Sequence, residues 1–176
     1  MGDGIEKVAQ TLAIIASASL SGARFIICFS HAGVPTLNVA PTDVLLREFS
    51  VMYSIGKRTS PPIAMTAAIC NGFLAYRSLH SHQRISGGIT PFALYSTAVL
   101  LVLAIIPYTL LAMEPRANKM LLDLGDQVTK GLNIEALKVA EDDVRNTLIV
   151  WKAMNARRAL FVGAGAVLTT IATIFR

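Results

Sequence analysis

Three hydrogen-bond donors share one face of a predicted helix near the end of the chain: Trp151, Asn155 and Arg158. They are four and three residues apart, which is the spacing that aligns side chains along a helix. An indole N–H, a carboxamide and a guanidinium can together hold an anionic oxygen. The alternative is an interfacial anchor, since Trp and Arg are common where helices enter a membrane. Asn155 favours the functional interpretation, because an amide near lipid needs a partner.

Three further polar residues, Tyr108, Asn118 and Arg24, are candidates for binding a substrate. The phenol of Tyr108 either contacts a ligand or belongs to the aromatic belt at the membrane interface. Asn118 either contacts a ligand or bonds backbone groups in a turn. Arg24, near the end of an apolar segment, either snorkels to the interface or donates into a cavity between helices.

The candidate proton acceptor is His31, which follows the first apolar segment. His80 and His82 are two residues apart, so they point to different sides of a helix and fit no zinc or di-iron spacing. Cys28 and Cys70 lie inside apolar segments, which favours small buried side chains over a disulfide or a metal pair. The sequence holds no nucleophile elbow, phosphate-binding loop or dinucleotide fingerprint, and no acid lies within a predicted span. We therefore expect no metal, no other cofactor and no chemistry by paired carboxylates.

The composition is that of a membrane protein rather than a soluble domain. Hydrophobic residues make up 53% of the 176 residues and charged residues 15%, and the mean hydropathy is +0.55. A soluble domain usually carries about 25% charged residues. The net charge of +5 suits basic loops near lipid headgroups. No basic run is interleaved with aromatic residues, so we do not expect a nucleic-acid partner.

Four apolar segments must position these side chains, near residues 8–29, 61–79, 89–113 and 145–175. About 20 apolar residues cross the hydrocarbon core of a bilayer. Residues 43–57, in the first loop, predict an amphipathic helix at the membrane interface. Residues 114–137 are of mixed charge and predict a polar connection, after which an extended last helix begins in water. The third segment contains Pro107, which predicts a kink.

The sequence thus predicts an all-α fold, an integral membrane four-helix bundle that crosses the membrane several times and forms a single domain over residues 1–176. Its motifs also match a known pattern in their order and spacing. The residues that carry this match are Ser21, Gly22 and Pro35; Tyr53, Gly56, Pro61 and Pro62; Pro107, Tyr108, Thr109, Pro115, Asn118, Leu121 and Leu122; and Trp151, Asn155 and Arg158. In these features the chain resembles the anthrone oxygenase-like membrane family over essentially its whole length.

The resemblance implies a function as well as a four-helix membrane fold. Fungal members of the family oxidise an anthrone to an anthraquinone with molecular oxygen, with no evident metal or flavin, in aromatic polyketide pathways of secondary metabolism. The implied activity is therefore that of a cofactor-independent anthrone oxygenase, a monooxygenase. Its partners would be a small aromatic polyketide, O2 and membrane lipid, and self-association into a homo-oligomer stays open.

The implied reaction fits the candidate residues. An anthrone has an acidic methylene, and its anion can pass an electron to oxygen directly. The site must bind a flat apolar ring system, accept one proton and donate hydrogen bonds to an oxyanion. We expect Trp151, Asn155 and Arg158 to supply the donors and His31 to accept the proton. The alternative is a non-enzymatic tetraspan scaffold or assembly protein, which gives no reason for three donors on one face.

Overall fold

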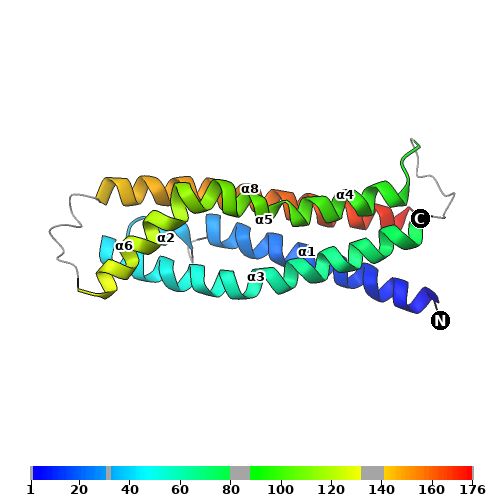
Figure 1. Cartoon of the computed structure of the whole chain (residues 1–176), viewed down its shortest axis with the longest axis horizontal. Coiled ribbons are helices and arrows are strands. Elements are labelled where there is room, and N and C mark those ends of the chain that lie inside the picture. The colour runs from blue at the N-terminus through cyan, green and yellow to red at the C-terminus, as the bar shows by residue number, and fades with distance from the viewer. Residues whose placement is uncertain (1, 31–32, 80–87, 132–140, 176) are drawn as a thin grey trace. The chain divides into compact units, whose positions relative to one another are not determined.

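The computed structural model describes all residues except 1, 31–32, 80–87, 132–140 and 176. Within the described residues every regular element is a helix, which confirms the all-α prediction. In chain order the elements are α1 (Gly2–Phe29), α2 (Val34–Leu37), α3 (Thr42–Ser78), α4 (Pro91–Leu103), α5 (Ile105–Tyr108), the π-helix η1 (Thr109–Asn118), α6 (Lys119–Thr129) and α8 (Glu141–Ile174) (Figure 1).

Three helical stretches of the described chain are long and apolar enough to cross a membrane. One contains α1, one runs over Pro91–Thr129, and one is α8. These stretches agree with three of the four expected spans. The fourth, expected near residues 61–79, is helical as part of α3 but is not among the three. Two prolines, Asn71 and Arg77 lower the hydropathy of that stretch.

The helix α3 differs from the prediction of an interfacial helix followed by a separate span. It is one helix of 37 residues from Thr42 to Ser78, with Asp43 in its first turn. Pro61 and Pro62 lie inside it. A proline within a helix removes one backbone hydrogen bond, and packing of the flanking turns can offset that loss. The span expected to begin at residue 61 is therefore the second half of a longer helix and not a separate element.

A second difference concerns the stretch after Pro107. The helix is interrupted near the expected kink: α4 ends at Leu103, and a turn at Ala104 separates it from α5. Leu103 is the residue whose carbonyl would have bonded the N–H that Pro107 lacks. The polar connection expected from residue 114 is instead helical to Thr129, first as the π-helix η1 and then as α6. Pro115 lies inside η1, where its missing N–H again disfavours regular α-helical bonding.

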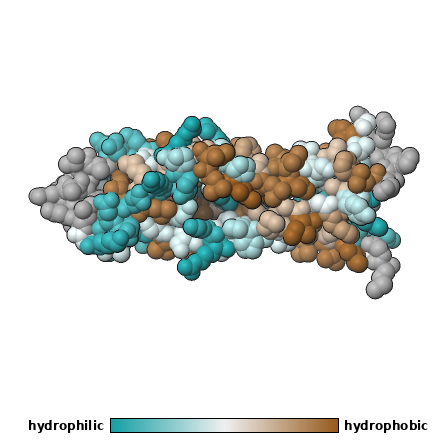
Figure 2. Space-filling model, viewed as in Figure 1, coloured by the Kyte–Doolittle hydropathy of each residue, from teal (hydrophilic) through white to brown (hydrophobic). Residues whose placement is uncertain are grey.

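The chain divides into two compact units, each built from pieces of several helices. Unit 1 comprises Met1–Gly22, Ser60–Ile105 and Arg158–Arg176, and unit 2 comprises Ala23–Thr59 and Ile106–Arg157. The core of unit 1 is rich in alanine, including Ala13, Ala67 and Ala98, which are fully buried. Figure 2 shows hydrophobic side chains on the surface of this unit over α4, where Leu100 is 68% exposed. An apolar surface of this kind suits lipid rather than water.

Small residues, Gly163 among them, let the helices of unit 1 approach closely. The Ser21 hydroxyl donates to the Ala159 carbonyl at 2.9 Å. A Cβ at position 163 would lie 2.8 Å from that same hydroxyl oxygen, so only glycine leaves room for the contact. In the same unit the Thr169 hydroxyl donates to the buried Asn71 amide oxygen at 2.7 Å. These are the small-residue and hydroxyl contacts by which membrane helices pack.

Unit 2 has larger apolar side chains in its core, and this core surrounds the candidate site. Its buried members come from α2, α3, η1, α6 and α8: Val34, Leu45, Leu46, Phe49, Met113, Ala117, Leu121, Val128, Val144, Leu148, Trp151 and Met154. Gly125 of α6 lies against α3, because a Cβ there would be 2.4 Å from the Ser50 hydroxyl oxygen and 3.1 Å from the Leu46 carbonyl oxygen.

Candidate functional site

A buried arginine and amide pair forms the first part of the site, within unit 2. Arg24 of α1 is 6% exposed and Asn155 of α8 is 2% exposed. The Arg24 Nη1 donates to the Asn155 Oδ1 at 3.0 Å. The Asn155 Nδ2 in turn donates to the Cys28 Sγ at 3.4 Å, and that thiol donates to the Lys152 carbonyl at 3.5 Å. Both ends of the amide are thus occupied, and the guanidinium lies inside the unit rather than snorkelling outward.

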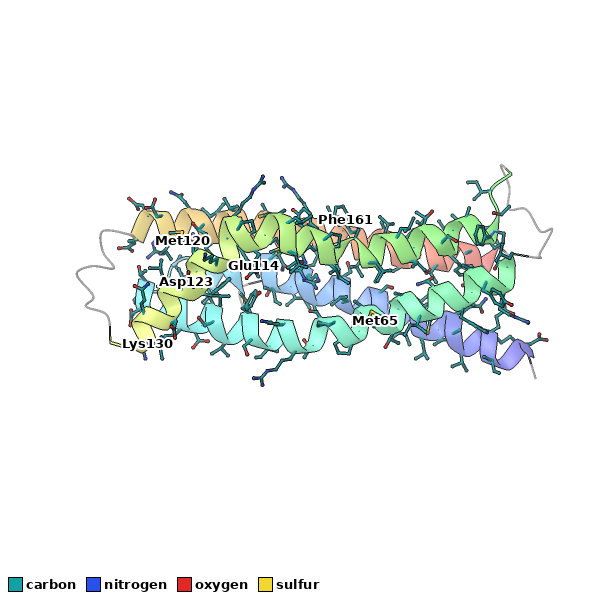
Figure 3. The ribbon with its side chains drawn as sticks, viewed as in Figure 1. Met65, Glu114, Met120, Asp123, Lys130 and Phe161 are labelled. Carbon is teal, nitrogen blue, oxygen red and sulfur yellow. The ribbon has the colours of Figure 1, made fainter. Side chains whose placement is uncertain are left out.

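A second network begins at the indole of Trp151. Its Nε1 donates to the Asn118 Oδ1 at 3.0 Å. The Asn118 Nδ2 donates to the Glu114 Oε2 at 2.9 Å, and the Tyr53 hydroxyl donates to the same oxygen at 3.4 Å. Asn118 is fully buried and Trp151 is 5% exposed, whereas Glu114 is half-buried. Glu114 lies on η1, as Figure 3 shows, so three elements supply this network: α3, η1 and α8.

Three aromatic rings lie beside these polar groups. The Phe49 ring meets the Trp151 ring edge to face, with centroids 5.2 Å apart and planes at 83°. The Phe49 and Tyr53 rings are stacked, with centroids 6.2 Å apart and planes at 26°. Phe49 and Tyr53 are four residues apart on α3, which places them on one helix face. The polar ends of Tyr53 and Trp151 therefore reach the Asn118 and Glu114 pair from two helices.

The helix α8 joins the two networks. Trp151 and Asn155 are four residues apart on it, so their side chains share one face. These are two of the three residues that the sequence predicted on one face, and both side chains are buried within unit 2. Neither is an exposed anchor at a membrane surface.

The remaining candidate residues have different positions. Tyr108 is half-buried and packs against the core of unit 2 that includes Trp151. Arg158 lies on α8 and is half-buried, but it belongs to unit 1. His31, His80 and His82 lie outside the described residues. Within the described residues, no three His, Cys, Asp or Glu side chains gather where they could hold a metal.

Glu114, Tyr53 and Cys28 were not predicted as site residues, and the structure brings them into the two networks. Glu114 was placed in a polar connection, because the apolar run ends at Met113. Its position four residues before Asn118 was the available signal, since that spacing joins side chains on a continuing helix. The helix does continue there, as η1.

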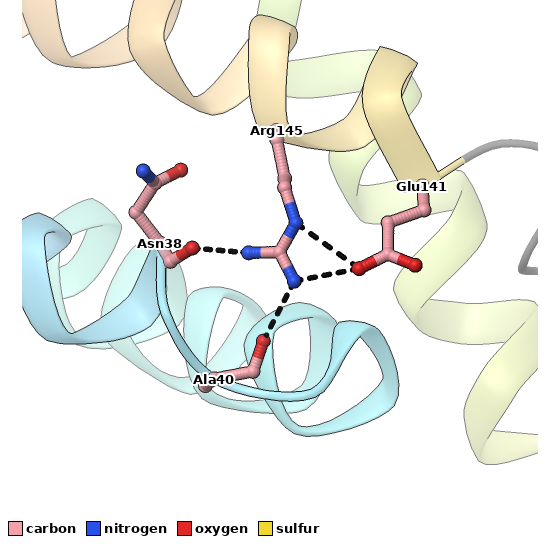
Figure 4. A network of polar contacts seen from close by, with 4 residues as sticks. All are labelled: Asn38, Ala40, Glu141 and Arg145. Atoms are coloured by element: carbon pink, nitrogen blue, oxygen red, sulfur yellow. Dashed lines mark hydrogen bonds and ion pairs between the residues drawn. The ribbon is translucent and has the colours of Figure 1, made fainter.

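A further polar network fixes the loop before α3, also in unit 2. The Arg145 guanidinium of α8 donates to the carbonyls of Asn38 and Ala40, the latter at 3.1 Å, and to the Glu141 Oε1 at 2.7 Å (Figure 4). Figure 2 shows hydrophilic side chains over the neighbouring α6. We interpret this network as structural, because two of its acceptors are backbone carbonyls.

Comparisons with known proteins agree with the resemblance seen in the sequence. The family described as anthrone oxygenase matches residues 49–168, which is more than half of the chain. The anthrone oxygenase tpcL of Aspergillus fumigatus is 27% identical over 164 residues, covering 92% of this chain and 90% of that protein. The anthrone oxygenase encC of the same fungus is 27% identical over 184 residues, covering 97% and 95%. The anthrone oxygenase ptaC of Pestalotiopsis fici is 26% identical over 125 residues, covering 70% and 81%. No solved structure matches the chain.

Proposed function

Since the chain belongs to the anthrone oxygenase family, we propose that it oxidises an anthrone to the corresponding anthraquinone with molecular oxygen. Two C–H bonds of the methylene carbon break, and that carbon becomes a carbonyl. One atom of O2 becomes the carbonyl oxygen, and the other leaves as water with the two protons. The carbon loses four electrons and O2 gains four, so the balance needs no further oxidant or reductant.

The observation that carries this proposal is the Arg24 guanidinium buried on the Asn155 amide oxygen. An arginine inside a membrane protein is costly, and it is a functional candidate for that reason. A guanidinium carries N–H donors in a planar fork, which suits the recognition of an oxyanion. We assign to Arg24 the contact with the anthranolate oxygen, which becomes negative when the methylene loses a proton.

Asn155 then has a positioning role that differs from the direct donor expected of it. Its Oδ1 accepts from Arg24 and its Nδ2 donates to Cys28, so donating to a substrate would break an existing bond. The flat ring system would lie against the aromatic wall formed by Trp151 and Phe49. Tyr108 stays a candidate for contact with the substrate, whereas the Asn118 amide, like that of Asn155, is bonded at both ends, to Trp151 and to Glu114. No role at this site is assigned to Arg158, which belongs to unit 1.

The test uses membranes that carry the chain, an anthrone substrate and ¹⁸O2. We expect anthraquinone to form faster than in membranes without the chain, with one ¹⁸O atom in each product above the spontaneous background. Arg24→Met should lower the rate by roughly 10²-fold, the scale of losing one preorganised oxyanion donor. Arg47→Met, at an exposed arginine of α3, is the matched control and should not change the rate. Membranes that show no turnover above background with any anthrone would favour the scaffold alternative.

The proposal includes independence from cofactors. The reaction balances without one, because the anthranolate itself supplies the electrons. Purified active protein should therefore contain no stoichiometric metal, haem or flavin. Elemental analysis that finds one metal per chain, together with loss of activity to a chelator, would overturn this part of the proposal.

A further inference from the structure

We propose, on the basis of the function proposed above, that Glu114 takes the proton from the anthrone methylene. That role was expected of His31, which lies outside the described residues. Glu114 is half-buried on η1, and both of its hydrogen bonds end on one oxygen, Oε2. Neither bond occupies Oε1. One carboxylate oxygen is thus held by the protein, and the other is the candidate to accept a proton.

The neighbours of Glu114 fix it as an acceptor. The Asn118 amide nitrogen and the Tyr53 hydroxyl both donate to it. An ionised carboxylate accepts hydrogen bonds and donates none, so both contacts suit the ionised form. Asn118 is itself oriented, because its Oδ1 accepts from the Trp151 indole. The carboxylate therefore has a defined position, which a general base needs before its basicity matters.

The aromatic rings supply the second observation. Tyr53, Phe49 and Trp151 form a continuous series of ring contacts, and the two outer rings are joined through Glu114 and Asn118. A carboxylate at the edge of a group of flat rings suits a substrate that is itself a flat ring system with one acidic C–H. An exposed surface glutamate would have water as its neighbour instead.

The π-helix gives a reason for this placement. Glu114 and Pro115 lie inside η1, a ten-residue π-helix. Such helices are rare, and those that do occur often lie at functional sites. They change the direction of a few side chains within a helix that continues on both sides. Met113, Ala117 and Asn118 of this helix are fully buried, so Glu114 is held beside the core and not on a free loop.

The proposed step is a proton transfer. A C–H bond of the methylene breaks, the proton moves to the Glu114 carboxylate, and the electron pair stays on the substrate as the anthranolate. Oxidation by O2 follows, and the proton leaves Glu114 with the water that the overall reaction forms. The step itself needs no oxidant, so it can be observed without oxygen.

The experiment measures exchange of the methylene hydrogens of an anthrone into D2O under anaerobic conditions, with membranes carrying the full chain. Membranes without the chain give the spontaneous rate. We expect the chain to accelerate exchange above the spontaneous rate. In Glu114→Gln the catalysed part of that rate should fall by at least about 10²-fold, the lower end of general base catalysis. Glu48→Gln makes the same chemical change at an exposed glutamate of α3 and should leave the rate unchanged.

The outcomes separate this inference from the proposed function. If the chain oxidises anthrones and Glu114→Gln exchanges at the parent rate, the inference is wrong and the function stands. If the chain shows no aerobic turnover of anthrones, the proposed function is wrong, and the role of Glu114 is wrong with it. Should Glu114→Gln not fold, Glu114→Asp keeps the charge and draws the carboxylate back, which should cost about 10²-fold if the position matters for catalysis. Parent-rate exchange in the folded Asp variant would also overturn the inference.

Discussion

Replacing Asn155 by alanine removes the acceptor of a buried guanidinium. The Arg24 Nη1 lies 3.0 Å from the Asn155 Oδ1, and both residues are less than one-tenth exposed. A hydrogen bond to a charged group contributes about 1.5–3 kcal/mol. The Asn155 contact with the Cys28 sulfur adds less, because sulfur is a weak acceptor. We expect Asn155→Ala to lower the free energy of unfolding by about 1.5–3 kcal/mol.

The same substitution should slow the proposed oxidation by roughly 10²-fold, since Arg24 would lose its bond to Asn155, which helps to orient it. A double-mutant cycle with Arg24→Met then isolates the interaction between the two side chains. The loss of unfolding free energy in the double variant should be smaller than the sum of the losses in the two single variants. The difference should be about 1.5–3 kcal/mol, because either change alone already breaks the bond.

The assay follows unfolding in detergent micelles by the fluorescence of Trp151, which is the single tryptophan of the chain. Asn146→Ala, at an exposed amide of α8, is the matched control and should change stability by less than about 0.5 kcal/mol. Additive effects of Asn155→Ala and Arg24→Met, within about 0.5 kcal/mol, would refute the reasoning, because the two side chains would not be interacting.

Three further substitutions test the packing around the site. Trp151→Phe keeps an aromatic ring but removes the indole N–H from Asn118, so stability should fall by about 1 kcal/mol, with unfolding followed by helical circular dichroism because this variant has no tryptophan. Gly125→Ala should lower the unfolding free energy by about 1–3 kcal/mol through overpacking. Gly56→Ala, with open space around it, should raise that free energy by roughly 0.5–1 kcal/mol. Equal effects of the two substitutions would contradict the close contact at Gly125. Arg145→Lys keeps the charge but loses the planar fork that bonds two backbone carbonyls, so proteolysis of the loop before α3 should become faster, and an unchanged rate would remove its structural role.

The helical fold could be predicted because it depends on local patterns. Uncharged runs of sufficient length mark helices whatever their partners, and three of the four expected spans lie in such helices. The interruption of the helix before Pro107 is also a local property, since that residue lacks the N–H for the Leu103 carbonyl. The shared face of Trp151 and Asn155 followed from their spacing alone.

Other features depend on contacts that are distant in the sequence. Arg24 could snorkel or turn inward, and its partner, Asn155, is 131 residues away. The continuity of α3 through Pro61 and Pro62 depends on packing that offsets the missing hydrogen bonds. Glu114 looked like the start of a loop, because nothing local to it shows that the helix continues as η1. The roles of these residues in catalysis stay predictions.

Substitution should lower the stability of the protein at Asn155 but not at Glu114, and this contrast tests the division of roles between them. Asn155 has both ends of its amide occupied, so its loss should reduce stability and activity together. Glu114 is a half-buried carboxylate that accepts hydrogen bonds from Asn118 and Tyr53. Glu114→Gln keeps an acceptor for Asn118 and Tyr53 and removes the charge. The folded state should therefore be as stable as the parent or more stable, while proton exchange is lost, which is the trade-off expected where a group is kept for function. A Glu114→Gln variant that loses stability as Asn155→Ala does would show that the carboxylate is a structural member of the network.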